Sequence, residues 1–151
     1  MGFRGGKLDE AEADLKKAHE LRPDDFLSSL FLSEVYVMQG RPQDALPLIE
    51  RVGYDPIRTF LYAIAYHALG QKKESDAALS ELITKYQASN PYQIAEIYAF
   101  RNQSDEAFEW LDRAYTKHDD NLIFTKVDPL LKSLHSDARF AVFLKKLNFP
   151  N

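Results

Sequence analysis

The sequence contains no cysteine, and this absence excludes disulfide bonds and metal sites built from thiolates. No apolar run approaches the roughly 20 residues that a membrane-spanning helix needs, and no apolar signal segment follows Met1. The net charge is −4, and lysines and arginines are scattered, which argues against a nucleic-acid-binding face. We therefore predict a cytoplasmic protein that binds neither a membrane nor nucleic acid.

Catalytic and cofactor motifs are also missing from the sequence. The four histidines are dispersed, and no phosphate-binding loop, G-x-S-x-G turn or EF-hand loop occurs. The nearest candidate for a metal cluster is His118-Asp119-Asp120, which is better explained as a solvated linker. The sequence therefore predicts no enzyme activity, no cofactor and no metal.

The most regular stretch covers residues 90–115 and reads as two short helices joined by a tight turn. Asn90 and Pro91 are typical of a helix start, and Asn102 tolerates the left-handed conformation that ends a helix. Ser104 is expected to cap the second helix. The inward face of that helix has three residues at helical spacing, Ala107, Leu111 and Ala114. A short connection makes the two helices antiparallel neighbours.

The same frame recurs upstream, with spacings of 34, 30 and 32 residues between the turn positions Gly6, Gly40, Gly70 and Asn102. A small residue follows each turn residue by five positions. Two further inward residues follow the small residue by four and by seven positions. These sets are Ala11, Leu15 and Ala18; Ala45, Ile49 and Val52; Ser75, Leu79 and Leu82; and Ala107, Leu111 and Ala114. Small residues let two helix backbones approach, and larger ones fill the space beside them.

This pattern resembles the tetratricopeptide repeat family, whose repeats of about 34 residues have a hydrophobic–small–x2–Tyr motif in the first helix. The motif occurs as Leu32-Ser33-x2-Tyr36, Tyr62-Ala63-x2-Tyr66 and Ile94-Ala95-x2-Tyr98. The resemblance implies an all-α fold, an α-solenoid of antiparallel helix pairs that form a superhelix. The sequence departs from the family pattern in two ways. No tryptophan opens a repeat, and Asn102 replaces the turn glycine.

The repeat frame also predicts the domain organisation. We expect a flexible N-terminus at residues 1–6, a repeat array over residues 7–120 and a C-terminal capping helix pair within residues 121–151. The array consists of an N-terminal half repeat and three full repeats, over residues 7–25, 26–57, 58–89 and 90–120. Because the half repeat leaves Ala11, Leu15 and Ala18 partly uncovered, a homodimer through it is one expectation.

The C-terminal part carries a narrower resemblance. Four segments are similar to the terminal tetratricopeptide block of bacterial regulatory proteins: residues 92–99, 107–115, 128–131 and 137–140. In those relatives the block follows a cyclase, kinase or winged-helix domain, and none of these parts is present in this sequence. The resemblance therefore implies a sensory or scaffolding module without its own activity.

In the family, the outer side of each first helix lines a concave groove that takes peptides. This side would carry Leu27, Leu30, Glu34, Val37 and Met38; Phe60, Ile64 and His67; and Tyr92, Glu96 and Phe100. The wall is apolar and mildly acidic, which favours an amphipathic helix or an extended apolar segment with a Lys or Arg. We therefore expect a scaffold that binds an unidentified protein or peptide. The alternatives are a groove filled by Phe140 or Phe143, and a structural or oligomerisation module of a larger signalling protein.

Overall fold

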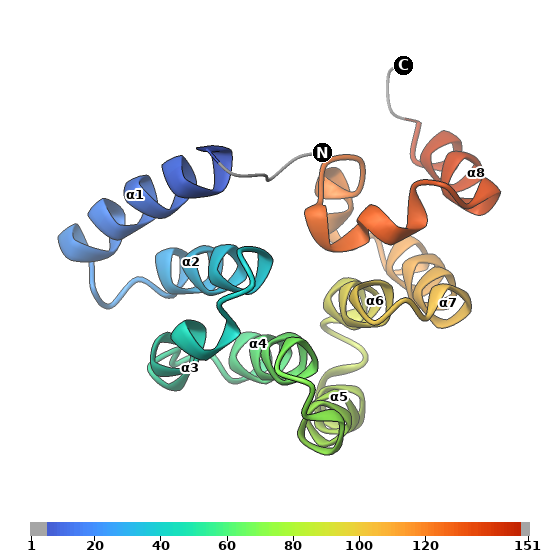
Figure 1. The fold of residues 1–151 in the computed structure, drawn as a ribbon. Coiled ribbons are helices and arrows are strands. Elements are labelled where there is room, and N and C mark those ends of the chain that lie inside the picture. Colours follow the sequence, from blue (N-terminus) through green and yellow to red (C-terminus); the bar gives the residue numbers. More distant parts are fainter. Residues whose placement is uncertain (1–5, 149–151) are drawn as a thin grey trace. The chain divides into compact units, whose positions relative to one another are not determined.

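A computed structural model describes residues 6–148 of the chain, and within that range the chain is helical without any strand (Figure 1). The α-helices are α1 (Gly6–Leu21), α2 (Phe26–Met38), α3 (Pro42–Glu50), α4 (Asp55–Ala68), α5 (Lys72–Tyr86), α6 (Pro91–Phe100), α7 (Ser104–Thr116) and α8 (Ala138–Lys146). Two 3₁₀ helices, η1 (Asp120–Phe124) and η2 (Pro129–Leu134), lie between α7 and α8. The predicted α-solenoid class is confirmed. Of the N-terminal segment expected to be flexible, Gly6 already belongs to α1, and residues 1–5 lie outside the described range.

The chain divides into two compact units, Met1–Leu82 and Ile83–Asn151, with the junction inside α5. In the first unit α2 packs against α1, α3 and α4. In the second unit α6 packs against α7 and η2. Most of these contacts join helices that follow one another in sequence, as expected for a solenoid. Among the described helices, none combines the length and the apolar character needed to cross a bilayer.

A left-handed residue follows the first helix of every complete pair. Gly40 and Gly70 have φ of 77°, and Asn102 has φ of 61°. In each turn the next amide donates to the carbonyl of the motif tyrosine, from Arg41 to Tyr36, Gln71 to Tyr66 and Gln103 to Tyr98, at 2.8 to 2.9 Å. These are the bonds of a Schellman motif, which satisfies the carbonyls at a helix end. The prediction that Asn102 replaces the turn glycine is confirmed.

Asn90 occupies the cap position of α6 as expected, but without a side-chain cap bond, whereas the prediction of Ser104 as a cap is wrong. The Asn90 side chain makes no cap bond to α6, because its amide bonds to the side chains of Gln93 and Ser89 instead. Ser104 lies inside α7, and Gln103 occupies the cap position. Side-chain caps come instead from aspartates, each of which accepts a bond from the backbone amide two residues later: Asp25, Asp119, Asp128 and Asp137.

Second helices contribute the core of the repeats. The inward positions of α3, α5 and α7 are buried, and so is Val52 just after the end of α3: Ala45, Ile49, Val52, Ser75, Leu79, Leu82, Ala107, Leu111 and Ala114. In α1 the equivalent Ala11 and Leu15 are only half-buried, and Ala18 is exposed. This exposure agrees with the expectation that the half repeat leaves these three residues partly uncovered, and Ala18 does not pack inward.

Two buried serines lead to opposite predictions for the same substitution. The hydroxyl of Ser33 on α2 is buried without a hydrogen-bond partner in the described part of the chain, whereas Ser75 donates to the Ala63 carbonyl at 2.8 Å. We expect Ser33→Ala to raise the free energy of unfolding by about 1 kcal/mol, because an unsatisfied buried hydroxyl is removed. Ser75→Ala should lower it by about 1 kcal/mol. Urea unfolding measures both, and changes of equal sign would contradict this account.

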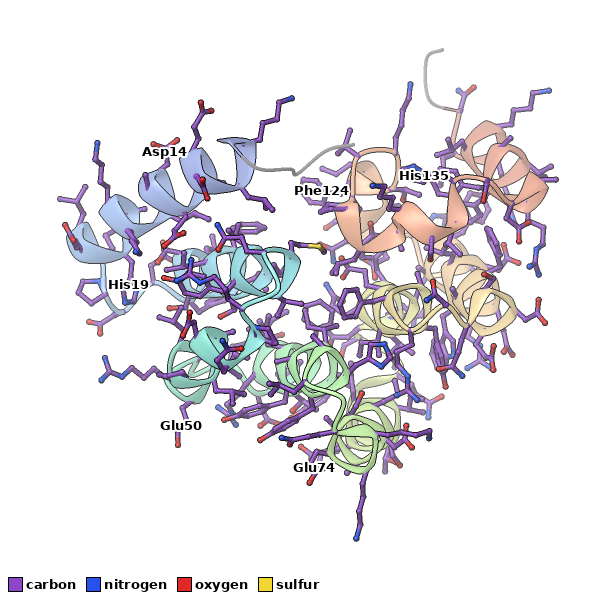
Figure 2. The ribbon with its side chains drawn as sticks, in the orientation of Figure 1. Asp14, His19, Glu50, Glu74, Phe124 and His135 are labelled. Atoms are coloured by element: carbon purple, nitrogen blue, oxygen red, sulfur yellow. The ribbon has the colours of Figure 1, made fainter. Side chains whose placement is uncertain are left out.

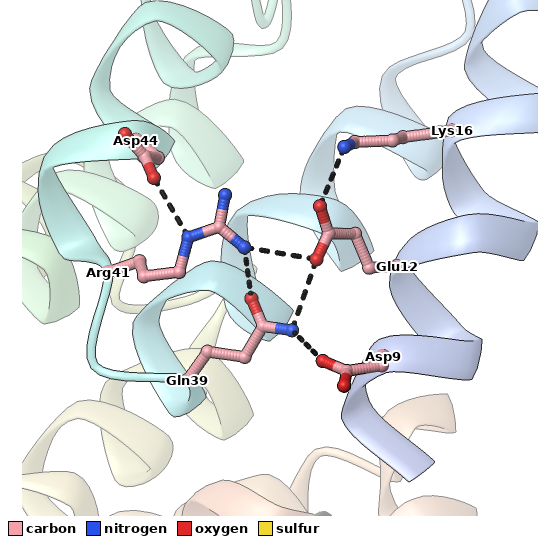
Figure 3. Close-up of polar contacts among 6 residues, drawn as sticks. All are labelled: Asp9, Glu12, Lys16, Gln39, Arg41 and Asp44. Atoms are coloured by element: carbon pink, nitrogen blue, oxygen red, sulfur yellow. Dashed lines mark hydrogen bonds and ion pairs between the residues drawn. The ribbon is translucent and has the colours of Figure 1, made fainter. Parts of the chain in front are cut away.

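A polar network joins α1 to the turn between α2 and α3 (Figure 3). The Glu12 carboxylate accepts bonds from Lys16 at 2.7 Å, from Gln39 at 3.2 Å and from Arg41 at 3.0 Å. Arg41 also pairs with Asp44 at 2.9 Å. These donors lower the pKa of Glu12 to about 2, and the hydrogen bond from Lys16 has the largest effect. The network therefore holds α1 to α2 only while the Glu12 carboxylate stays ionised.

This network predicts acid-sensitive attachment of α1. Because the pKa of Glu12 falls on folding from 4.5 to about 2, its contribution is complete above pH 4.5 and is lost as the pH falls towards 2. Allowing for screening by solvent, we expect the free energy of unfolding to drop by about 1 kcal/mol over this range. Glu12→Gln should lack this drop. Urea unfolding at pH 7, 4.5 and 3 tests this, and equal acid losses in both proteins would contradict it.

Candidate docking surface

In the first unit, the accessible part of the predicted groove lies on α2. Leu27 is 48% exposed, and three further predicted residues are partly exposed, Leu30, Glu34 and Met38. Val37 is buried instead and lines the core. Phe31, which the sequence analysis missed, is 47% exposed. Since Phe31 follows Leu27 by four residues, helical spacing alone would have placed it on the same side.

The predicted residues on α4 are mostly core. Phe60 is 1% exposed and Ile64 is fully buried, while His67 is partly exposed. Helix α4 is apolar around most of its circumference, and such a helix is normally enclosed by its neighbours. Within the first unit it packs against α2 and α3. Phe60 and Ile64 therefore offer no accessible wall to a ligand.

In the second unit, the C-terminal segment covers the predicted residues on α6. Tyr92 and Glu96 are buried, and Phe100 is partly exposed. The Tyr92 hydroxyl donates to the Asp128 carboxylate at 2.7 Å, and the Ser133 hydroxyl donates to the Ala99 carbonyl at 2.7 Å. Burial is the main cause that raises the pKa of Tyr92 far above its usual range, and the nearby acidic charges add to the effect. The hydroxyl therefore keeps its proton and remains a donor. Helix η2 thus covers this side of α6.

The two phenylalanines expected to fill a groove pack elsewhere. Phe143 meets Tyr115 of α7 edge-on, with ring centroids 6.5 Å apart. Phe140 lies against His135, with ring centroids 4.7 Å apart. Helix η2 therefore covers α6. The prediction that Phe140 or Phe143 would fill the groove is wrong.

Helix α8 lies beside α7 in the way a further second helix would. Arg139 pairs with Asp105 at 2.9 Å, and Lys146 pairs with Asp112 at 3.3 Å. Each pair is 34 residues apart in sequence, which equals the repeat length, and the two pairs ascend together, so α7 and α8 are parallel. The cations also lie over aromatic rings of α7, Phe108 and Tyr115. In the C-terminal segment η2 therefore packs against α6, and α8 packs against α7.

Other surface features of the second unit carry no recognisable chemistry. A shallow pocket of about 630 Å³ is lined by Gln87, Ala88, Glu109, Trp110, Asp112, Arg113, Thr116 and Lys117. Its charges are mixed, and Arg113 already stacks over Trp110. Exposed apolar side chains occur at Ile123, Phe124 and Val127, of which Figure 2 labels Phe124 on η1. Among residues 6–148, no group of three or more His, Asp or Glu side chains could hold a metal ion.

Comparison with known proteins finds a family match in the N-terminal part of the chain. Residues 3–56 match a family model described as tetratricopeptide repeat. This range contains the half repeat and the first complete pair, α2 and α3. No solved structure matches the chain.

A curated relative of the chain is much longer than the chain itself. The signal recognition particle receptor FtsY of Aquifex aeolicus (strain VF5) is 32% identical over 112 residues, which are 74% of this chain. The chain spans 23% of that relative's length. The likeness therefore concerns a part of the relative, and the narrower resemblance to bacterial regulatory proteins stays a prediction.

The tetratricopeptide match bears directly on the accessible part of α2. Stacked helical repeats generally present their extended surfaces to other proteins. Leu27, Phe31 and Met38 lie within the matched residues 3–56. We call the accessible residues on this side of α2 the α2 stripe: Leu27, Leu30, Phe31, Glu34 and Met38.

Proposed function

We propose that the chain is a non-catalytic scaffold that binds a helix or an extended peptide of another protein along the α2 stripe. The observation that carries this proposal is the half-exposed state of Leu27 and Phe31 on a helix that is otherwise packed on α1, α3 and α4. Large apolar side chains in a row on one side of a helix suit a partner. The lack of cysteine suits a reducing compartment such as the cytoplasm.

The chemistry of the stripe defines the kind of ligand. Glu34 is the single charged residue of α2, and the remaining stripe residues are apolar. An amphipathic segment with apolar residues at helical spacing would cover the stripe, and one Lys or Arg would meet the acidic charge. Covering the exposed halves of Leu27 and Phe31 contributes about 1 kcal/mol each. Loss of both contributions should therefore weaken peptide binding by roughly thirtyfold.

Selection from a displayed library of helical peptides tests this proposal. The enriched peptides should be amphipathic and should contain a Lys or Arg. A variant with both Leu27→Ser and Phe31→Ser should bind them at least tenfold more weakly, with a melting temperature close to that of the wild type. Val142→Ser, at a residue 67% exposed on α8, is the matched control and should bind normally. Undiminished binding to the double variant would contradict the proposal.

A structural module of a larger protein is the second candidate. Two observations favour it, the covering of α6 by η2 and the small share of the longer relative that the chain spans. Light scattering together with the peptide selection distinguishes the two functions. A monomer that enriches peptides dependent on the α2 stripe supports the scaffold. A tight dimer that enriches none supports the structural module.

A further inference from the structure

The segment that follows α7 exposes a group of large side chains because of its tight winding. In η1 and the turn after it, every third residue is buried: Leu122, Thr125 and Asp128. A 3₁₀ helix repeats every three residues, so the two positions between successive buried residues face away from the core. These positions are exposed, and we call them together the η1 patch: Ile123, Phe124, Lys126 and Val127.

Hydrogen bonds before, within and after the η1 patch hold it in place. The Asp119 side chain caps η1 by accepting from a backbone amide. Within the segment, the Thr125 hydroxyl donates to the Leu122 carbonyl at 2.7 Å. Directly after the patch, the buried Asp128 carboxylate accepts from the Tyr92 hydroxyl at 2.7 Å. The patch is therefore preformed, and its backbone loses little freedom when a surface binds to it.

The η1 patch also has the composition that the α2 stripe requires of a ligand. The stripe is apolar apart from Glu34, so its ligand needs apolar side chains at helical spacing and one cation. Ile123 and Val127 are four residues apart and are 67% and 74% exposed, and Phe124 beside them is 49% exposed. Lys126 supplies the cation, and its charge is opposite to that of Glu34. Patch and stripe are therefore complementary in both apolar character and charge.

We propose that the η1 patch of one copy binds the α2 stripe of a second copy, so that the chain competes with the ligand of its own stripe. This inference rests on the proposed function, because it names an occupant of the same stripe. The two surfaces differ, so the contact is heterologous, and a pair of copies keeps one patch and one stripe to which further copies add. A contact of so few side chains buries less than the roughly 1,600 Å² of a standard interface, so the association is reversible and depends on concentration.

Analytical ultracentrifugation of the full chain from micromolar to millimolar concentration tests this inference. The weight-average mass of the wild type should rise with concentration. A patch variant with Ile123→Ser and Val127→Ser should associate at least tenfold more weakly, and so should a stripe variant with Leu27→Ser and Phe31→Ser. All four residues are at least 47% exposed, so the circular dichroism of both variants should match that of the wild type. Val142→Ser, at an exposed residue of α8, is the matched control and should associate as the wild type does.

Mixing the two variants is the decisive step. The patch variant keeps an intact stripe and the stripe variant keeps an intact patch, so the mixture should form a complex of one copy of each that does not grow further. Absence of this complex would overturn the inference. If the chain stays a monomer while selected peptides bind the α2 stripe, the inference fails and the proposed function stands. If the mixed complex forms and the library enriches no peptide, the proposed function fails and the self-association stands.

Two other results would assign a different occupant. A monomeric wild type that binds a selected peptide more weakly than the patch variant does would overturn the inference in favour of a contact within one copy. Association that the patch variant retains and Ala18→Glu abolishes would overturn it in favour of a homodimer through the half repeat.

Discussion

Replacing Phe60 with serine is expected to lower the free energy of unfolding by about 4 kcal/mol. The Phe60 side chain is 1% exposed and lies on α4, which packs against α2 and α3. Truncating a buried phenylalanine removes its packing and leaves a cavity, and the serine hydroxyl would be buried in an apolar place. A loss of this size is a large fraction of the stability of a small domain. The first unit should therefore be largely unfolded at moderate temperature.

Leu27→Ser is the matched control for Phe60→Ser. Leu27 is half-exposed on the α2 stripe, so its loss should cost less than about 1 kcal/mol. Far-UV circular dichroism during urea unfolding measures both variants. Helical spacing in the repeat frame predicted that Phe60 lines a ligand groove. If Phe60→Ser kept the stability of the wild type, that interpretation would stand and the burial described here would be contradicted.

Asp128→Ala is expected to cost the second unit about 3 kcal/mol. Asp128 is buried, and it makes two bonds: it accepts from the Tyr92 hydroxyl and, as the cap of η2, from the Leu130 amide at 2.9 Å. Alanine removes the cap and leaves the Tyr92 hydroxyl buried without its acceptor. Because η2 covers α6, we expect η2 to detach before the rest of the unit unfolds.

Two further variants separate these contributions. Asp137→Ala removes a cap from α8 that is not buried, together with its pair to Arg139, and should cost less than Asp128→Ala. Tyr92→Phe removes only the donor and should cost about 1 to 2 kcal/mol, less than additive with Asp128→Ala. Trp110, the single tryptophan, is in the second unit and reports its unfolding by fluorescence. Equal costs for Asp128→Ala and Asp137→Ala would contradict the role assigned to the Tyr92 bond.

The Tyr92 bond also predicts a response to alkali. Since folding raises the pKa of Tyr92 above the ordinary value of 10, its contribution to stability is complete below pH 10. As the pH rises above 10, the unfolded chain loses the proton that the folded chain keeps, and stability falls. Tyr92→Phe should remove this alkaline loss.

The helical pairing could be predicted from the sequence because its determinants are local. Asn102 follows Tyr98 by four residues, and the bond that closes the turn joins Gln103 to Tyr98. The small residue Ala107 comes five positions after the turn residue and is buried as expected. Turn chemistry and helical spacing act within a few residues, so the repeat frame determined which helices are neighbours.

The exposure of single groove residues could not be predicted in the same way. Tyr92 was expected to face a ligand, but its hydroxyl meets Asp128, which is 36 residues away in sequence. Helical periodicity gives the side of α6 on which Tyr92 lies, but it does not say what covers that side. Likewise, Asn90 occupies the cap position of α6, but its side chain bonds to Gln93 and Ser89 and not to a backbone amide of the helix. Contacts between distant segments decide such cases.

The most direct test of the recognition surface is a nuclear magnetic resonance titration with a selected peptide. The chain has two methionines and one tryptophan, so the Met38 methyl reports the α2 stripe and the Trp110 indole reports α7 of the second unit. The account predicts that the Met38 methyl resonance shifts with saturation while the Trp110 indole resonance stays in place. A saturable shift at Trp110 with an unchanged Met38 methyl would contradict it.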